Sequence, residues 1–233
     1  MPTAPLKTAP ARSVTEAMET RVTVRQFLDK PVPRDVLTKL LDTARRTPSG
    51  GNLQPWRVHV LTGDKLKRFV AAGLDKAKGG PPETPSYPAY PEPLWEPKKT
   101  WRREVGYALY ELMGIERHDK MGRMGAALRN MEFFDAPVGL IVTADERCGV
   151  PQYMDIGIYL QSLMLLAREA GLHTAPQGWW RQYPSLPREH LDYPDTEEVV
   201  VGMSLGYGDP DAAVNTLYAD RAQLGELVHF YEE

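Results

Sequence analysis

Hydrophobic residues between Pro33 and Arg46 recur every three or four positions, which is the spacing of one face of an α-helix. The stripe consists of Val36, Leu37, Leu40, Leu41 and Ala44. The positions between them are mostly polar, so we predict an amphipathic helix that ends in a turn beginning at Thr47.

The same reasoning predicts five further helices. Ser13 and Glu16 have the spacing of a capping box, and the short helix that they begin ends near Arg21. The other four cover residues 64–72, 98–113, 121–134 and 153–170. The helix over 153–170 is apolar almost all round, so we expect it in the core or against a second subunit.

β-branched and apolar runs predict strands over residues 56–61, 137–143 and 198–205, with a short strand after Gly171. Residues 21–27 also alternate as a strand does. Arg21, Thr23 and Arg25 share one face of that strand, and Val22, Val24 and Gln26 share the other. Two arginines with a hydroxyl between them are a candidate phosphate clamp, although a solvated edge strand has the same pattern.

Two segments fit neither pattern. Residues 1–12 are proline-rich and have no apolar core of a signal peptide, so we expect a flexible arm. Residues 79–97 carry seven prolines together with Tyr87, Tyr90 and Trp95. We interpret this stretch as an insertion over a site or along a partner, because its aromatic rings need a surface to pack on. There is no internal repeat and no clean boundary, so we expect residues 1–233 to form a single domain.

Composition narrows the function classes. Charged residues make up 25% of the chain and the net charge is −3, which predicts neither a nucleic-acid partner nor an anionic membrane surface. No apolar stretch has the length of a membrane span. The single cysteine, Cys148, excludes an intrachain disulfide framework and fits a reducing cytoplasm.

The turn over residues 45–56 is the strongest candidate for a binding loop. Pro48 and Pro55 forbid a helix there, and Gly50 and Gly51 allow backbone angles that other residues avoid. The loop also brings three polar side chains together: Ser49, Asn52 and Gln54. Such a loop can bind a flat polar ligand or a phosphate, or it can simply connect a helix to a strand.

Several motifs that resemble catalytic signatures lack their structural context. Ser204 lies in a G-x-S-x-G sequence, but inside a predicted strand with no helix after it, which argues against a hydrolase. The five histidines have no metal-type spacing, so we expect no metal site. Neither a dinucleotide-binding glycine motif nor a P-loop occurs, and Cys148 has no identifiable base beside it.

Taken together, residues 21–27 and 47–56 resemble the paired signature of the FMN-dependent nitroreductase superfamily. The segments Asp135-Ala136-Pro137, 155–171 and 175–178, and an arginine in the tail, agree in order. The resemblance covers most of the chain. It implies an α/β (α+β) fold: a three-layer sandwich whose mixed, mostly antiparallel sheet is flanked by helices, within an intertwined homodimer.

The resemblance also implies a set of cofactor-binding residues for FMN. Arg21, Val22, Thr23, Arg25 and the tail residue Arg221 match the positions that bind the phosphate and ribityl chain. The loop of the other subunit would contribute Pro48, Ser49, Gly50, Asn52 and Gln54. Pro176, Gln177 and Gly178 match the segment at the flavin N5 edge.

At two positions this chain differs from some members of the superfamily, so their residue roles cannot be assigned to it directly. Some members of the superfamily carry a glutamate where this chain has Gln177, so no charged role is expected there. Those members also place a basic group near flavin N1 and O2, where this chain offers Arg129 or Asn130, of which we take Asn130 as the candidate.

The activity implied is reduction of nitroaromatic or quinone-like acceptors, with NADPH or NADH as the donor and hydride passing through flavin N5 in a ping-pong cycle. No catalytic side chain is expected, since the cofactor carries the chemistry. Tyr87, Tyr90, Trp179 and Trp180 are candidates for substrate walls, and four arginines are candidates for a 2′-phosphate: Arg102, Arg103, Arg117 and Arg123. The alternatives are a flavoenzyme with a narrower acceptor and a flavin carrier or sensor without turnover.

Overall fold

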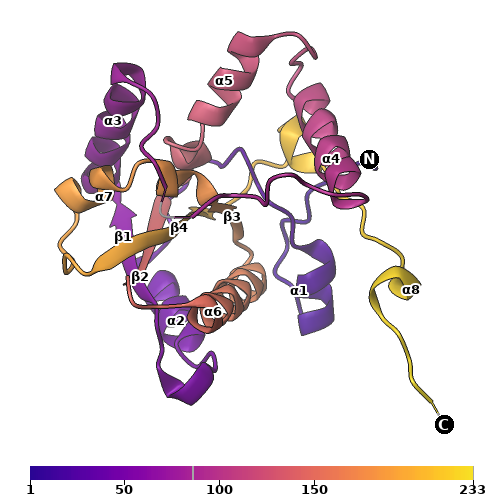
Figure 1. Ribbon diagram of the computed structural model, residues 1–233, viewed down its shortest axis with the longest axis horizontal. Coiled ribbons are helices and arrows are strands. Elements are labelled where there is room, and N and C mark those ends of the chain that lie inside the picture. Colours follow the sequence, from indigo (N-terminus) through magenta and orange to yellow (C-terminus); the bar gives the residue numbers. More distant parts are fainter. Residues whose placement is uncertain (86, 233) are drawn as a thin grey trace.

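The centre of the molecule is a four-stranded antiparallel sheet with the strand order β1-β2-β4-β3 (Figure 1). The computed structural model describes residues 1–85 and 87–232. The strands are β1 (Arg57–Thr62), β2 (Val138–Asp145), β3 (His173–Gln177) and β4 (Glu197–Gly206). A parallel component is present as one isolated bridge between Thr23 and Thr174. The prediction of a mostly antiparallel sheet is therefore confirmed.

Helices cover both faces of the sheet. On one face, α2 (Arg34–Ala44) and α6 (Val150–Glu169) pack on alternate residues of β2 and β4, such as Leu140 and Met203. The other face receives α3 (Gly63–Gly79), α7 (Ser185–His190) and the 3₁₀ turn η3 (Gly178–Gln182). The predicted three-layer arrangement is confirmed, and α6 is the long central helix expected from its all-round apolar sequence.

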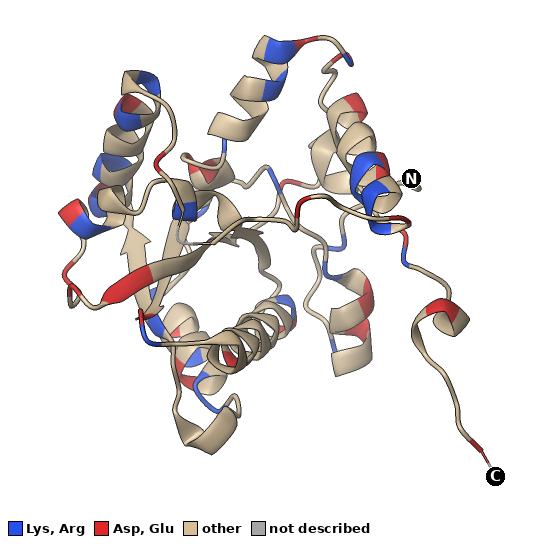
Figure 2. Cartoon of the chain, viewed as in Figure 1, with Lys and Arg blue, Asp and Glu red and all other residues tan. Residues whose placement is uncertain are grey.

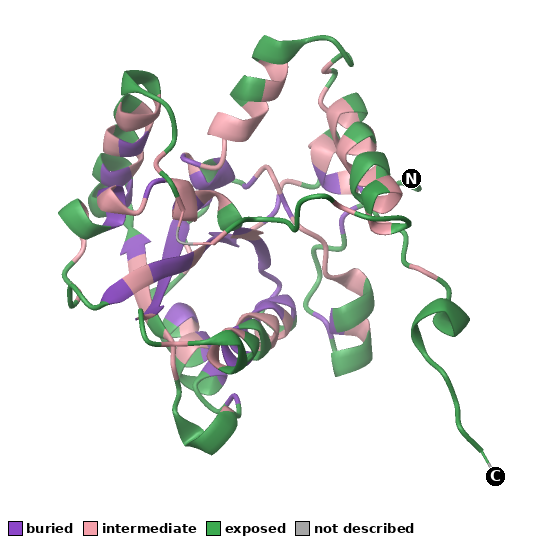
Figure 3. Ribbon diagram, viewed as in Figure 1, coloured by how far each residue is buried: buried purple, intermediate pink, exposed green. Residues whose placement is uncertain are grey.

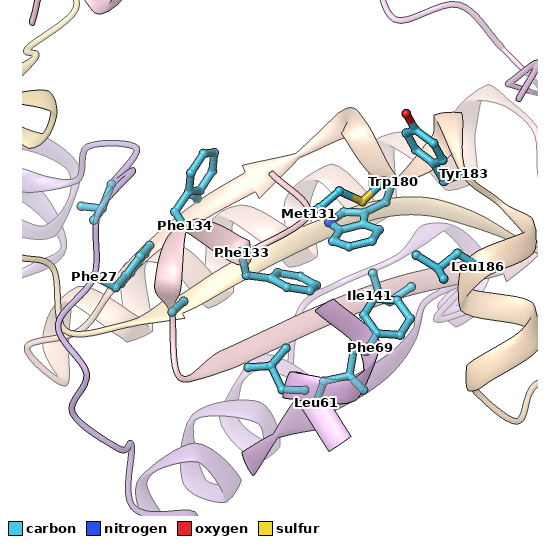
Figure 4. Close-up of a cluster of buried hydrophobic side chains, with 14 of the residues drawn as sticks. Phe27, Leu61, Phe69, Met131, Phe133, Phe134, Ile141, Trp180, Tyr183 and Leu186 are labelled. Carbon is cyan, nitrogen blue, oxygen red and sulfur yellow. The ribbon is translucent and has the colours of Figure 1, made fainter. Parts of the chain in front are cut away.

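The second face is filled by aromatic rings (Figure 4). Trp180 is fully buried, with its ring centroid 4.7 Å from that of Phe133 and 5.3 Å from that of Phe69. Gly202 lies under Trp180 and Gly139 lies under Phe133, where any side chain would collide with the ring above it. The rings of Trp180 and Phe133 therefore fill the space that side chains at Gly202 and Gly139 would occupy. This packing fixes η3 against β4.

The remaining elements are short or medium-length helices and 3₁₀ turns. They are α1 (Val14–Thr20), η1 (Gly50–Asn52), α4 (Lys98–Leu112), α5 (Lys120–Leu128), η2 (Phe133–Asp135), η4 (Ala213–Thr216) and α8 (Leu224–Leu227). Figure 1 shows α8 and the chain after it leading away from the body. Figure 3 shows that this tail is exposed, whereas β2, β3 and most of β4 are buried.

The prediction that residues 21–27 form a strand is wrong, because they belong to no strand of the sheet. The predicted alternation of the side chains between two faces is seen at Val24, which is buried. Val24 is fully buried and its N–H bonds the carbonyl of Thr174, but the next two N–H groups bond no neighbouring strand. The amides of Arg25 and Gln26 instead donate to the side-chain oxygen of Asn215, at 2.8 and 3.2 Å. A single side chain thus takes the place of a strand partner.

Two helix boundaries and one terminus also differ from prediction. Helix α3 runs to Gly79 rather than Ala72, because Leu74 and Ala77 pack on the aromatic core. Helix α5 ends at Leu128 rather than near residue 134, because Phe133, Phe134 and Asp135 have positive φ angles.

The expected flexible arm over residues 1–12 packs against the body instead. Leu6 and Ala11 are buried, and Thr3 forms a bridge with Leu217. Gly79 is the last residue of α3, and residues 80–85 and 87–97 contain no helix or strand, as predicted.

A buried histidine fastens this arm to the sheet. The Nδ1 atom of His173 accepts from the Gly208 N–H at 3.2 Å, and its Nε2 lies 3.1 Å from the carbonyl oxygen of Lys7. These partners require a neutral ring with its proton on Nε2. Burial, and then the nearby charge of Arg168, lower the pKa of His173 to about 4.

We expect this histidine to make the protein less stable as the pH falls from about 6.5 to about 4. The unfolded chain binds a proton at the ordinary histidine pKa, whereas the folded chain does not, so acidification favours unfolding. The difference amounts to roughly 3 kcal/mol of unfolding free energy, measurable by urea titration across this range. His173→Gln should have a flatter profile, and equal slopes for the two proteins would contradict the neutral buried ring.

Candidate functional site

The first half of the predicted site forms one cavity of about 550 Å³ at the end of α1. It brings together five predicted residues that come from two distant parts of the chain: Arg21, Val22, Thr23, Arg25 and Arg221. Arg21 is the C-terminal cap of α1, so the end of that helix begins the extended segment that carries the other three. The sequence prediction thus grouped these residues correctly.

The arginines of this cavity lack acidic partners. Within the described part of the chain, no carboxylate lies within 4.0 Å of the guanidinium of Arg21, Arg25 or Arg221. Glu19 and Asp220 line the same cavity without forming an ion pair with them. Burial lowers the pKa of Arg21, with a further contribution from the charge of Arg221, and burial also lowers the pKa of Arg25.

An unused donor points to the same conclusion. The Nε atom of Arg21 is buried and has no hydrogen-bond partner among the described residues. Buried donors and like charges that repel one another cost free energy unless an anion joins them. A group with several negative oxygens, such as a phosphate, would pair with this donor and offset these charges.

Asn215 holds the arginine segment in place, and the sequence did not reveal it. Besides accepting from the Arg25 and Gln26 amides, its Nδ2 donates to the carbonyl oxygens of Gln26 (2.7 Å) and Asp209 (2.9 Å). The four hydrogen bonds satisfy the fully buried side chain and hold residues 25 and 26 against η4. An asparagine 190 positions away from Arg25 gives no local signal of this role.

A second cavity, of about 270 Å³, adjoins the first because Thr23 and Arg25 line both. Its other walls come from α4, α5 and the end of β3, and include Asn130, Phe134 and Pro176. A ligand with a phosphate in the first cavity and a planar ring in the second would lie across Thr23 and Arg25. This arrangement fits FMN, which combines such a phosphate with such a ring.

The choice between Arg129 and Asn130 becomes clearer. The guanidinium of Arg129 forms ion pairs with Glu132 (2.8 Å) and Asp135 (2.9 Å) and donates to the Gln26 side chain. Two carboxylates neutralise its charge, so it is not a free cation for a ligand. Asn130 lines the cavity with an amide whose Nδ2 bonds only the Ala127 carbonyl among the described residues, and it remains the candidate.

Gln177 lies beneath the site rather than in it. Its side chain is 2% exposed, and its Nε2 donates to the backbone oxygen of Asn130 at 2.8 Å. Its Oε1 accepts from Ser204 at 3.2 Å and from the indole N–H of Trp180 at 3.3 Å. With its donors and acceptor occupied, the Gln177 side chain ties β3, β4, α5 and η3 together, and only its backbone is left for a ligand.

The predicted loop lies apart from the arginines within one chain. Pro48, Ser49, Gly50, Asn52 and Gln54 surround η1 beside α6, where the Gly50 N–H donates to the buried carboxylate of Asp155. None of the five lines either cavity described above. All but Ser49 are exposed, and Asn52 and Gln54 have positive φ angles, so the loop presents a shaped, open surface.

The structure also decides between the roles considered for Ser204, Cys148 and the aromatic residues. Ser204 is fully buried within β4, so its hydroxyl is not a nucleophile at an elbow. Burial raises the pKa of the Cys148 thiol, which argues against a thiolate. Trp180 belongs to the core and is not a substrate wall, Trp179 packs beside Tyr183, and Tyr90 is exposed beneath the guanidinium of Arg102.

The four arginines considered for a 2′-phosphate lie on and around α4 and α5, whose basic residues are visible in Figure 2. Arg117 lies over the ring of Tyr107, and Arg123 shares a cavity with it. Their role stays a prediction. No helix in the described residues is long and apolar enough to cross a membrane, and these residues contain no cluster of ligands that could hold a metal ion.

Comparison with known proteins agrees with this geometry. The model of the nitroreductase family matches residues 18–207. The chain is 40% identical to the chloronitrobenzene nitroreductase of Comamonas testosteroni over 235 residues, which cover 100% of both chains. It is 39% identical to the 4-nitrobenzoate reductase of Pseudomonas putida over 210 residues, or 90% of this chain and 92% of that one.

A solved structure extends the agreement to the fold. The crystal structure of the FMN and NADPH-dependent nitroreductase NfnB from Sphigopyxis sp. strain HMH superposes with a TM-score of 0.88. It is 38% identical and covers 95% of this chain and 100% of that chain.

We expect inorganic phosphate to stabilise the ligand-free protein through the arginine cavity. At ten times its dissociation constant, phosphate should raise the unfolding free energy by about 1.4 kcal/mol, seen as a higher melting temperature than in chloride of equal ionic strength. Arg25→Met should lose this increase, and Arg34→Met, a change on the exposed side of α2, should keep it. An equal increase in all three proteins would show that phosphate binds elsewhere.

Proposed function

The chain belongs to the nitroreductase family, and we propose that it binds FMN and reduces nitroaromatic compounds with NADPH or NADH as the electron donor. Two relatives are named for nitroaromatic substrates, and one solved relative is named for FMN and NADPH. Quinone-like acceptors follow from the family resemblance alone. We place the protein in the cytoplasm, with the whole chain as one FMN-binding domain.

The observation that carries the proposal is the set of arginines without acidic partners. Arg21, Arg25 and Arg221 converge on one cavity, and burial together with the charge of Arg221 lowers the pKa of Arg21. A phosphate monoester carries up to two negative charges and three oxygens that accept hydrogen bonds. FMN has such a group, and its ring would extend into the cavity lined by Asn130 and Pro176.

The protein would orient the reactants rather than react with them. Arg21, Arg25 and Arg221 would hold the phosphate, and Thr23 would lie beside the ribityl chain. Pro176 and Phe134 would form walls for the planar ring, with the Asn130 amide at its polar edge. When bound, FMN supplies the transfer of reducing equivalents from the nicotinamide to the nitro group. We assign no side chain as acid, base or nucleophile.

A second copy of the chain would complete the site. The loop around Asn52 is open in the single chain and is separate from the arginine cavity. Apolar residues near it on α6 are also exposed, among them Val150 (74%) and Met154 (65%), as are Phe230 (74%) and Tyr231 (94%) in the tail. We propose a homodimer in which these surfaces are covered and the loop of one subunit meets the flavin of the other.

We expect the purified protein to be yellow, with flavin absorbance that bleaches when NADPH or NADH is added without oxygen. A nitroaromatic acceptor should restore the colour and be consumed, which absorbance and product chromatography measure. A colourless protein that cannot be loaded with FMN would contradict the proposal. Bleaching too slow for turnover would favour a flavin carrier instead.

Mixed dimers test whether each site is shared between subunits. We expect Arg25→Met and Asn52→Ala to reduce FMN binding when each variant is made alone. A mixed dimer of the two has one site with both changes and one with neither, so it should recover about half of the FMN of the unaltered dimer. Retained FMN is measured after gel filtration of dimers that carry two different tags.

The same mixture distinguishes the opposite arrangement. If loop and arginines act within one chain, every site in the mixed dimer carries one change and no recovery occurs. Normal FMN binding by Asn52→Ala alone would make the loop a simple connection between α2 and β1.

A further inference from the structure

Arg181 is a cation that no described carboxylate neutralises, and it lies next to the predicted flavin edge. It belongs to η3, three residues after Gly178, and its Nε donates to the Gly178 carbonyl at 3.3 Å. Its Nη1 donates to the backbone oxygen of Tyr87 at 3.3 Å, and its Cζ lies 4.4 Å from the centre of the Tyr87 ring. Arg181 therefore connects the proline-rich segment to the loop that begins at Gly178.

This connection holds the guanidinium in a defined orientation. The Tyr87 ring stacks on it, while the Tyr87 hydroxyl donates to the carbonyl of Val200 on β4 at 3.2 Å. Tyr87 is thus anchored at its backbone, ring and hydroxyl. A guanidinium has five N–H donors, and two bond backbone oxygens here, so three remain for a ligand.

The cavity beside Arg181 suits an aromatic compound. Its volume is about 840 Å³, and it extends from Gly178 and Tyr87 past Leu160 and Val200 to Val150 and Met154, the part of α6 that the second subunit of the proposed homodimer would adjoin. This is within the size range of small-molecule sites, which combine apolar walls with a few polar groups. One acidic residue, Glu198, also lines it, and its carboxylate accepts a hydrogen bond from the hydroxyl of Tyr153.

The relatives leave open which nitroaromatic compounds this chain prefers, since one is named for a neutral substrate and another for a carboxylate. We propose that Arg181 binds the carboxylate of an anionic nitroarene, so that nitrobenzoates are preferred over neutral nitroarenes of the same shape. The aromatic ring would lie along the apolar wall of the cavity. This inference rests on the proposed function and adds a specificity-determining residue to it.

The test compares 4-nitrobenzoate with 4-nitrobenzamide, which has nearly the same shape and no charge. For the FMN-loaded enzyme we expect a higher kcat/KM with the carboxylate. In Arg181→Met the ratio of the two kcat/KM values should fall about tenfold or more, since a charge-assisted hydrogen bond is lost. Arg181→Lys keeps the charge and should retain part of the preference.

Arg68→Met is the matched control, because Arg68 is exposed on α3 away from this cavity. It should leave the ratio unchanged. An unchanged ratio in Arg181→Met would overturn the inference. So would an equal loss with both substrates, which would show that Arg181 only holds Tyr87 and Gly178 in place.

A binding measurement separates this inference from the proposed function. Benzoate, which has no nitro group to reduce, should bind the FMN-loaded protein in a calorimetric titration and bind Arg181→Met about tenfold more weakly. If the unaltered enzyme reduces neither nitro compound, the proposed function fails and the titration alone decides the role of Arg181. Equal benzoate affinity in the two proteins would reject that role whatever the activity.

Discussion

A cavity lined by three arginines without acidic partners is the feature on which the rest of the site depends. Arg21, Arg25 and Arg221 surround one cavity, and no described acidic side chain neutralises them. Such a cluster persists only if the backbone that carries it cannot move apart. The parallel bridge from Thr23 to β3 and the hydrogen bonds of Asn215 hold the segment that carries Arg25 in place.

The wall opposite the arginines is stiffened in a similar way. Three consecutive residues, Phe133 to Asp135, have positive φ angles, which residues other than glycine rarely adopt. Ion pairs from Arg129 to Asp135 and Glu132 hold this strained turn in place. Gln26 donates a hydrogen bond to Asp135 and so joins the same network. Gln26 follows Arg25 directly, so both sides of the predicted flavin site share one set of polar contacts. Gln177 then links this wall to the sheet through Asn130.

In one chain the arginine cavity and the cavity beside it share Thr23 and Arg25, but the polar loop lies elsewhere. The Gly50 amide is bound to Asp155 on α6, and α6 also exposes apolar residues near its beginning. The loop and the exposed apolar residues thus lie beside the same helix, α6. A second subunit that packs on this helix would also meet the loop, which supports a site made by two subunits. The proline-rich segment has a different role, because Tyr87 and Arg181 bring it to the rim near Gly178.

By itself, the sequence determined the layers of the fold and which side chains share one face of the segment around Arg21, Thr23 and Arg25. Helical spacing in α2, α4 and α6 and alternation around Arg21, Thr23 and Arg25 are local patterns, and local backbone geometry enforces them. Only the tertiary structure decided which polar side chains face a ligand. Gln177 is occupied by Ser204 and Trp180, Arg129 by two carboxylates, and the backbone of Arg25 by Asn215. Contacts between residues so far apart leave no periodic pattern, because they depend on the packing of whole elements and not on neighbours along the chain.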